Sequence, residues 1–173
     1  MLTEILRIQK IELVPFDIEM EREHNIINSL YLQADELERK NFERFERYKI
    51  IEENEVMYEE YMTDDADIII AATGIASRIS LSSVEKAREK GIKAGLIRPI
   101  TLWPFPKAAF AKAADHCQQI IAVELNMGQM IEDIRMAVEY RVPVSLYNRT
   151  GGVLPDVYEI LGVIENAAKG GMR

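Results

Sequence analysis

The sequence predicts an α/β fold in three layers, with helices on both faces of a mostly parallel sheet. From about Asp64 onward, short apolar runs rich in β-branched residues alternate with longer segments that have helical spacing. Glycines and prolines lie at several of the junctions between them. Strands separated by crossover helices pair in parallel, and the right-handed preference of these crossovers places helices on both faces of the sheet.

The first strand of this pattern is the run DIIIAATG, from Asp67 to Gly74. A continuous apolar run that ends in a glycine is typical of a strand buried on both faces. The sequence Ser82-Ser83-Val84-Glu85 then has the form of a capping box and predicts the start of a helix that Gly91 ends.

Three further strand and helix pairs follow. The expected strands are Lys93 to Ile97, Gln119 to Glu124 and Val144 to Tyr147. The expected helices begin near Pro106, after Gly128 and around Pro155, and each of the last two carries apolar residues at spacings of three and four.

The segment before Asp64 is dense in charge and has a different character. Asp35 with Glu38 predicts a capped helix from about Glu36 to Glu53, and we read the residues before it as an extended arm. The run VMYEEY, Val56 to Tyr61, has the β-branched and aromatic content of a strand, and its glutamates suit an edge rather than the centre of the sheet. A residual helix is the alternative for this run.

Composition excludes several classes of function. The chain has 173 residues with a net charge of −8 and no stripe of basic and aromatic residues, which argues against nucleic acid as a partner. No apolar run approaches the length of a membrane span and no secretory leader is evident, so we expect a cytoplasmic protein that does not bind membranes. Cys117 is the only cysteine, and one thiolate cannot hold an iron–sulfur cluster.

The common catalytic motifs are absent. Thr73-Gly74-Ile75-Ala76-Ser77-Arg78 has one glycine where a dinucleotide fingerprint needs three, and neither a phosphate loop nor a nucleophile elbow occurs. The two histidines lie far apart, with no carboxylates or cysteines at ligand spacing. We therefore expect no catalytic, cofactor-binding or metal-binding residue in this chain.

Polar residues and glycines instead follow the predicted strands, at the edge where open parallel sheets place their functional loops. This edge is the candidate site, as an interface or an anion-binding rim, and its residues are Gly74, Ser77, Arg98, Glu124, Asn126, Gly128 and Gln129. We expect Arg98 and Glu124 to pair across neighbouring strands, and the free N–H groups after Gly128 to offer a place for an anion. The alternative is that the glycines only close turns and the charges only cap helices.

Three strings at this edge carry a resemblance to a known family. They are DADIIIAATGIASR, EKGIKAGLIRPITLWPFP and IIAVELNMGQMIEDIR. Together they resemble the C-terminal domain of the α subunit of 2-oxoacid:ferredoxin oxidoreductases, closest to the 2-oxoisovalerate type. The segment from Asn25 to Tyr61 is more weakly similar to the connection between the two domains of that subunit.

The resemblance implies a fold like the C-terminal domain of transketolase, with a mostly parallel five-stranded sheet and one antiparallel edge strand, which fits VMYEEY. It implies that residues 1–53 form an arm and linker helix and that residues 54–173 form the domain. Thiamine diphosphate, magnesium and the iron–sulfur clusters would belong to the rest of the complex, because the chain has no G-D-G metal motif.

The implied function is that of a non-catalytic domain that serves subunit assembly. The whole enzyme would decarboxylate a 2-oxoacid oxidatively, transfer the acyl group to coenzyme A and reduce ferredoxin, and we expect it to be an oligomer. Two alternatives stay open: a stand-alone module that binds a small anion, and the C-terminal domain of a transketolase or pyruvate dehydrogenase.

Overall fold

The protein contains a five-stranded sheet, seen in a computed structural model that describes residues 30–170. The strands lie in the order β1-β3-β2-β4-β5. β1 pairs antiparallel with β3, and all other pairs are parallel. The strand bounds are β1 Tyr58–Tyr61, β2 Ile68–Ala72, β3 Ala94–Pro99, β4 Gln119–Glu124 and β5 Val144–Asn148. This confirms the predicted fold class and its single antiparallel edge strand.

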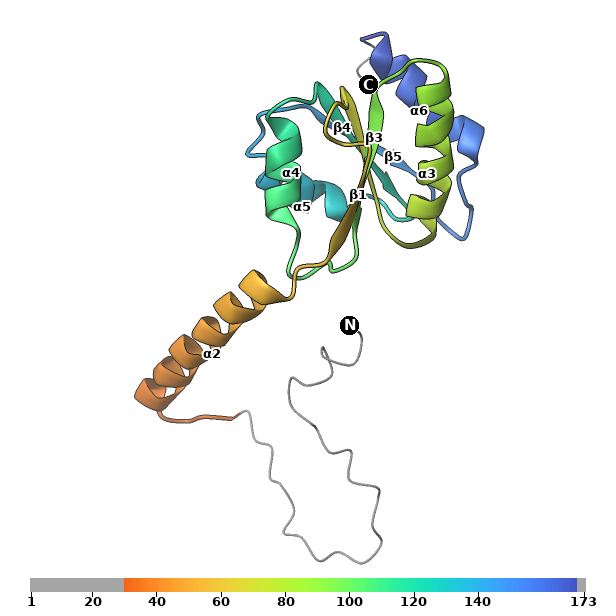
Figure 1. Cartoon of the computed structure of the whole chain (residues 1–173). Helices are drawn as coiled ribbons and strands as arrows, with labels where there is room; N and C mark the ends of the chain where they lie inside the picture. The colour runs from red at the N-terminus through yellow and green to blue at the C-terminus, as the bar shows by residue number, and fades with distance from the viewer. Residues whose placement is uncertain (1–29, 171–173) are drawn as a thin grey trace, which may run out of the picture. The chain divides into compact units, whose positions relative to one another are not determined.

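Two pairs of helices cover the sheet and complete the three layers. Figure 1 shows α4 and α5 on one face of the sheet and α3 and α6 on the other. The helix bounds are α2 Ala34–Asn54, α3 Gly74–Glu89, α4 Lys107–Ala114, α5 Met130–Ala137 and α6 Val157–Ala168.

The central strands are buried on both faces because their side chains alternate between two cores. In β2, Ile69 and Ala71 belong to the core beneath α4 and α5, whereas Ile68 and Ile70 belong to the core beneath α3 and α6. Every residue of β2 and β4 is buried. The continuous apolar runs in the sequence follow directly from this arrangement.

Because β1 is a strand, the alternative of a residual helix for the run VMYEEY is wrong. Its Glu59 lies opposite Arg98 of β3, and the Arg98 Nη1 donates to Glu59 Oε2 at 2.9 Å. Three of its four residues are exposed, as expected for an edge strand.

The predicted capping box at Ser82-Ser83-Val84-Glu85 is wrong. α3 begins eight residues earlier, at Gly74, so these residues lie inside the helix. The Ser83 hydroxyl instead donates to the carbonyl of Ile79, one turn back, and to the carbonyl of Val157 in α6. A complete capping box does form at Asp156 and Glu159, where α6 begins.

The helix predicted from Glu36 to Glu53 is present as α2, and none of its residues is buried. By its internal contacts the chain divides into two units, residues 1–41 and residues 42–173, and α2 contributes to both. Within the second unit, the Tyr48 ring packs edge-on against Trp103 with ring centroids 5.4 Å apart. Residues 1–29, which include most of the predicted arm, lie outside the described residues, and the boundary at residue 53 stays a prediction.

Between residues 30 and 170, none of the helices combines the length and the apolar character needed to cross a bilayer.

Candidate functional site: the carboxyl edge of the sheet

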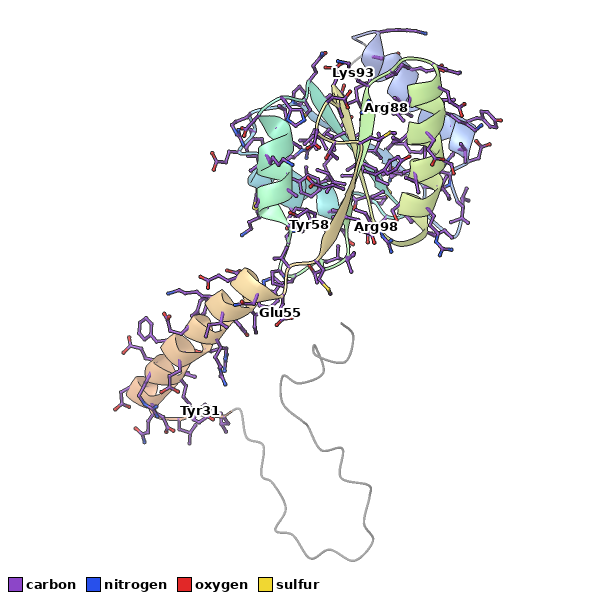
Figure 2. All side chains as sticks on the ribbon, in the orientation of Figure 1. Tyr31, Glu55, Tyr58, Arg88, Lys93 and Arg98 are labelled. Atoms are coloured by element: carbon purple, nitrogen blue, oxygen red, sulfur yellow. The ribbon has the colours of Figure 1, made fainter. Side chains whose placement is uncertain are left out.

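The candidate residues gather at the carboxyl edge of the parallel strands, as predicted. Gly74 and Ser77 follow β2, Arg98 is the fifth of the six residues of β3, and Glu124 ends β4. Asn126, Gly128 and Gln129 form the turn from β4 to α5. Figure 2 shows Arg98 at the same end of the sheet as Tyr58, with Arg88 and Lys93 at the opposite end.

Glu124 is the most constrained of these residues. Its side chain is only 5% exposed. Oε2 accepts hydrogen bonds from the backbone N–H groups of Gln129 at 3.0 Å and Met130 at 2.9 Å. Oε1 accepts from the N–H of Ile131 at 2.9 Å. The carboxylate therefore supplies the negative charge that the positive end of the α5 dipole favours.

The geometry of this turn excludes the anion site expected after Gly128. The N–H groups that would have bound an external anion are already occupied by Glu124. Asn126 tightens the turn, because its Oδ1 accepts from the Gly128 N–H at 2.7 Å. Gly128 has φ +98°, which favours glycine, and a Cβ there would lie 3.0 Å from a Leu146 methyl carbon, so the leucine side chain would have to shift.

Arg98 and Glu124 do not pair, which corrects the sequence-based expectation. Strand β2 lies between β3 and β4, so the two side chains are not on neighbouring strands. Arg98 pairs with Glu59 instead, and its Nε has no hydrogen-bond partner among the described residues.

Gly74 and Ser77 shape the start of α3. Gly74 has φ +57°, which glycine adopts without strain, and Ser77 is buried with its hydroxyl donating to the Gly74 carbonyl at 2.7 Å. The neighbouring Thr73 hydroxyl donates to the Pro99 carbonyl at 3.1 Å and so ties the ends of β2 and β3 together.

A polar cluster at the end of β5 was not anticipated from the sequence. The Tyr147 hydroxyl donates to Glu159 at 3.0 Å, and Arg149 forms an ion pair with the same carboxylate. Burial, followed by the hydrogen bond to Glu159, raises the pKa of Tyr147. The backbone N–H of Asp156, then Tyr147 and Arg149, lower the pKa of Glu159. These contacts fix the loop that leads into α6, and the buried Nε of Arg149 has no hydrogen-bond partner among the described residues.

Exposed apolar side chains were also missed, although they dominate this edge. Each parallel strand is followed, in the next loop or in the first turn of the next helix, by at least one of them. The set is Ile75, Ile100, Leu102, Trp103, Leu125, Met127, Val153 and Leu154, with exposures from 36% to 80%. We call these eight residues the apolar edge. They follow the predicted strand ends in the sequence, but single apolar residues in loops have no period that marks them as a set.

Cys117 carries an unreactive thiol at the amino ends of the parallel strands, away from the candidate site. It is 7% exposed and ends the turn before β4. Burial raises its pKa to about 11, so the thiol stays protonated at neutral pH and is a poor nucleophile.

The turn from β4 to α5 does not fit thiamine diphosphate with magnesium. A diphosphate site needs free N–H donors and a magnesium ion needs a set of oxygen ligands. The donors of α5 are taken by Glu124, and between residues 30 and 170 no three His, Cys, Asp or Glu side chains gather as metal ligands.

Comparison with known proteins identifies the domain. Residues 66–160 match the family model of pyruvate:ferredoxin oxidoreductase core domain II. The chain belongs to this family.

Relatives of this domain are subunits of 2-oxoacid oxidoreductases. The ketoisovalerate oxidoreductase subunit VorB of Methanothermobacter thermautotrophicus is 50% identical over 144 residues, which are 83% of this chain and 41% of that protein. The 2-oxoglutarate synthase subunit KorA of Methanothermobacter marburgensis is 36% identical over 102 residues, 59% of this chain and 27% of that protein. The chain thus spans about two fifths of the length of the VorB subunits it matches.

Solved structures show the same fold. A 2-oxoglutarate:ferredoxin oxidoreductase from Magnetococcus marinus superimposes with a TM-score of 0.65 at 18% identity, covering 83% of this chain and 25% of that chain. A split-gene transketolase superimposes with a TM-score of 0.56 at 16% identity, covering 65% of this chain and 41% of that chain. The transketolase-like fold predicted from the family resemblance is therefore confirmed.

Proposed function

We propose that this domain is an assembly element of a thiamine-dependent 2-oxoacid:ferredoxin oxidoreductase and carries out no chemical step itself. In the complete cytoplasmic enzyme, other domains and subunits hold thiamine diphosphate, magnesium and the iron–sulfur clusters. That enzyme decarboxylates a 2-oxoacid, forms an acyl-coenzyme A and passes the electrons to ferredoxin.

The apolar edge is the observation that carries the proposal. Large exposed apolar side chains after every parallel strand, gathered at one edge of the sheet, are typical of a surface that another protein covers. The Glu124 carboxylate beneath them is already satisfied within the chain by three backbone hydrogen bonds. An edge built in this way favours protein contact over the binding of a small charged ligand.

For the substrate, we propose a branched-chain 2-oxoacid such as 2-oxoisovalerate. The support is the 50% identity to a ketoisovalerate oxidoreductase subunit, against 36% to a 2-oxoglutarate synthase subunit.

Replacing Ile75 and Leu102 together with aspartate tests the assembly role. Both side chains are about half exposed, at 49% and 59%, so the domain itself should remain folded. Burying two uncompensated carboxylates in an interface should weaken association with the other subunits by at least about tenfold, which corresponds to ~1.4 kcal/mol. Association is measured by analytical sedimentation of the mixed subunits, with 2-oxoisovalerate-dependent ferredoxin reduction as a second readout.

Tyr140→Asp is the matched control. Tyr140 is 72% exposed but lies in the loop before β5, at the amino ends of the parallel strands and thus away from the apolar edge. The Tyr140→Asp variant should therefore assemble with the other subunits as the wild-type chain does. Normal assembly of the Ile75→Asp/Leu102→Asp variant would refute the assembly role, and loss of affinity for a small anion without loss of assembly would favour the binding module.

A further inference from the structure

Strand β5 leaves one side of its backbone open. The N–H of Ile120 donates to the carbonyl of Pro143, and the N–H of Arg149 donates to the carbonyl of Glu124. Backbone groups alternate sides along a strand, so the odd-numbered residues from 143 to 149 face β4. The N–H and C=O groups of Val144, Leu146 and Asn148 therefore face away from the sheet, and no described residue bonds to them.

The two outermost strands of the sheet, β1 and β5, differ in how their open sides are protected from pairing with another chain. β1 is four residues long and carries Glu59 and Glu60, which pair with Arg98 and Lys112. Short length and charge are the usual means of preventing an edge from pairing with another chain. β5, with the sequence VSLYN, contains neither a charged residue nor a proline, and all five residues are only partly buried.

We propose that β5 pairs antiparallel with β5 of a second copy of this chain, about a two-fold axis at Leu146, and so continues the sheet through both copies. In this register Leu146 lies opposite Leu146, and Val144 lies opposite Asn148. Each of these pairs exchanges two backbone hydrogen bonds, so every outward N–H and C=O group of the three residues gains a partner. The surface is self-complementary, as an isologous contact requires.

The charges around β5 also permit contact with a second copy. The basic residues that flank the strand are neutralised within each copy, because Arg141 pairs with Asp115 and Arg149 pairs with Glu159. Like charges therefore do not oppose the contact across the axis.

An exposed methionine next to the edge gains a partner in the same arrangement. The Met127 sulfur lies 3.7 Å from the Asn148 amide nitrogen, and this side chain is 80% exposed. With Asn148 opposite Val144 of the second copy, Met127 would cover that valine. Val144 and Leu146 pack against the core beneath α4 and α5, so the contact would extend an existing apolar layer.

Sedimentation and site-specific crosslinking of the full 173-residue chain test the proposal. The wild-type chain should sediment as a dimer with a dissociation constant below about 100 μM. In the proposed register the two Leu146 Cα atoms lie about 5.5 Å apart, within the range that a disulfide spans. Leu146→Cys should therefore form a disulfide-linked dimer under mild oxidation. The buried Cys117 should not react, so the wild-type chain reports the background.

Val144→Cys is the matched control. It lies on the same strand with the same outward backbone, but four residues from its counterpart across the axis, which is roughly 13 Å. It should crosslink at least about tenfold more slowly than Leu146→Cys, because that separation exceeds the reach of a disulfide. Circular dichroism confirms that both variants are folded.

A wild-type chain that stays monomeric up to 200 μM would overturn the proposal and leave the edge to a strand from a different protein. A dimer in which Val144→Cys and Leu146→Cys crosslink equally fast would overturn it as well, because the contact would then lie elsewhere. Neither result depends on Ile75 and Leu102, because these two residues follow β2 and β3, which are separated from β5 by β4 in the strand order.

Discussion

Glu124 shows how a buried charge can be a structural element. A carboxylate removed from water costs several kcal/mol unless hydrogen bonds replace its hydration. Here three backbone N–H groups do so, and they are the groups that the first turn of α5 would otherwise leave unsatisfied. One side chain at the end of β4 thus fixes the position and direction of the following helix.

Replacing Glu124 with alanine should therefore destabilise the domain. The substitution leaves three N–H groups without their acceptor, two of them in bonds buried from solvent, and we expect a loss of about 3 kcal/mol in the free energy of unfolding. Urea denaturation followed by circular dichroism measures it. Glu132→Ala, at an exposed residue of α5, is the control and should change stability by less than about 0.5 kcal/mol. Equal effects of the two substitutions on stability would contradict the role of Glu124 in fixing the start of α5.

The sequence predicted that Glu124 lies at the carboxyl edge of the sheet but not what it contacts. Its position after an apolar run indicated a strand end, and the turn residues after it indicated the helix start. Its partner depended on strand order, which short-range patterns do not encode. The mistaken pairing with Arg98 arose because β2, earlier in the sequence, inserts between β3 and β4.

At the level of elements, the β1–β2 connection is held against the start of β3. A Cβ on Gly95 would lie 2.6 Å from the Met62 carbonyl oxygen, closer than two such atoms can approach. The same oxygen accepts from Arg88 Nη2 at 2.7 Å, and Arg88 also pairs with Asp65, whose pKa it lowers. The connection therefore cannot move away without breaking bonds to α3.

Gly95→Ala should cost roughly 2 to 3 kcal/mol in the free energy of unfolding, because the obstructing atom is backbone. Gly162→Ala is the matched comparison. Its Cβ would meet nothing within 4 Å in α6, and alanine there should stabilise the helix by about 0.5 to 1 kcal/mol. Thermal unfolding of both variants measures the difference, and a neutral Gly95→Ala would show that the connection is free to shift.

Local sequence signals located the helices and strands well, but they located some element boundaries more accurately than others. Gln119 to Glu124 was predicted to the residue, since a run buried on both faces has sharp ends. The start of α3 was missed because its N-terminal residue is a glycine at positive φ, with no side chain that bonds as a cap, whereas Ser82 and Glu85 imitate a cap inside the helix. Where a true box exists, at Asp156 and Glu159, both reciprocal bonds form.

At the scale of the whole molecule, stability is concentrated around the central strands. β2 and β4 have no exposed residue and separate two apolar cores. α2 has no buried residue at all. The sequence foresaw this contrast from composition, but it did not reveal the apolar edge, because single apolar residues in loops carry no period.

Hydrogen exchange should resolve this contrast along the chain. Amides of Ile68–Ala72 and Ile120–Val123 should exchange only when the whole domain unfolds, because their bonds lie between buried strands. Amides of α2 should open locally, with protection factors at least about 100-fold lower, because little apolar burial opposes opening of the helix. Mass spectrometry of peptic fragments, repeated at two protein concentrations, separates local opening from protection by self-association. Protection in α2 equal to that in β2 and β4 at the lower concentration would mean that the helix unfolds together with the core.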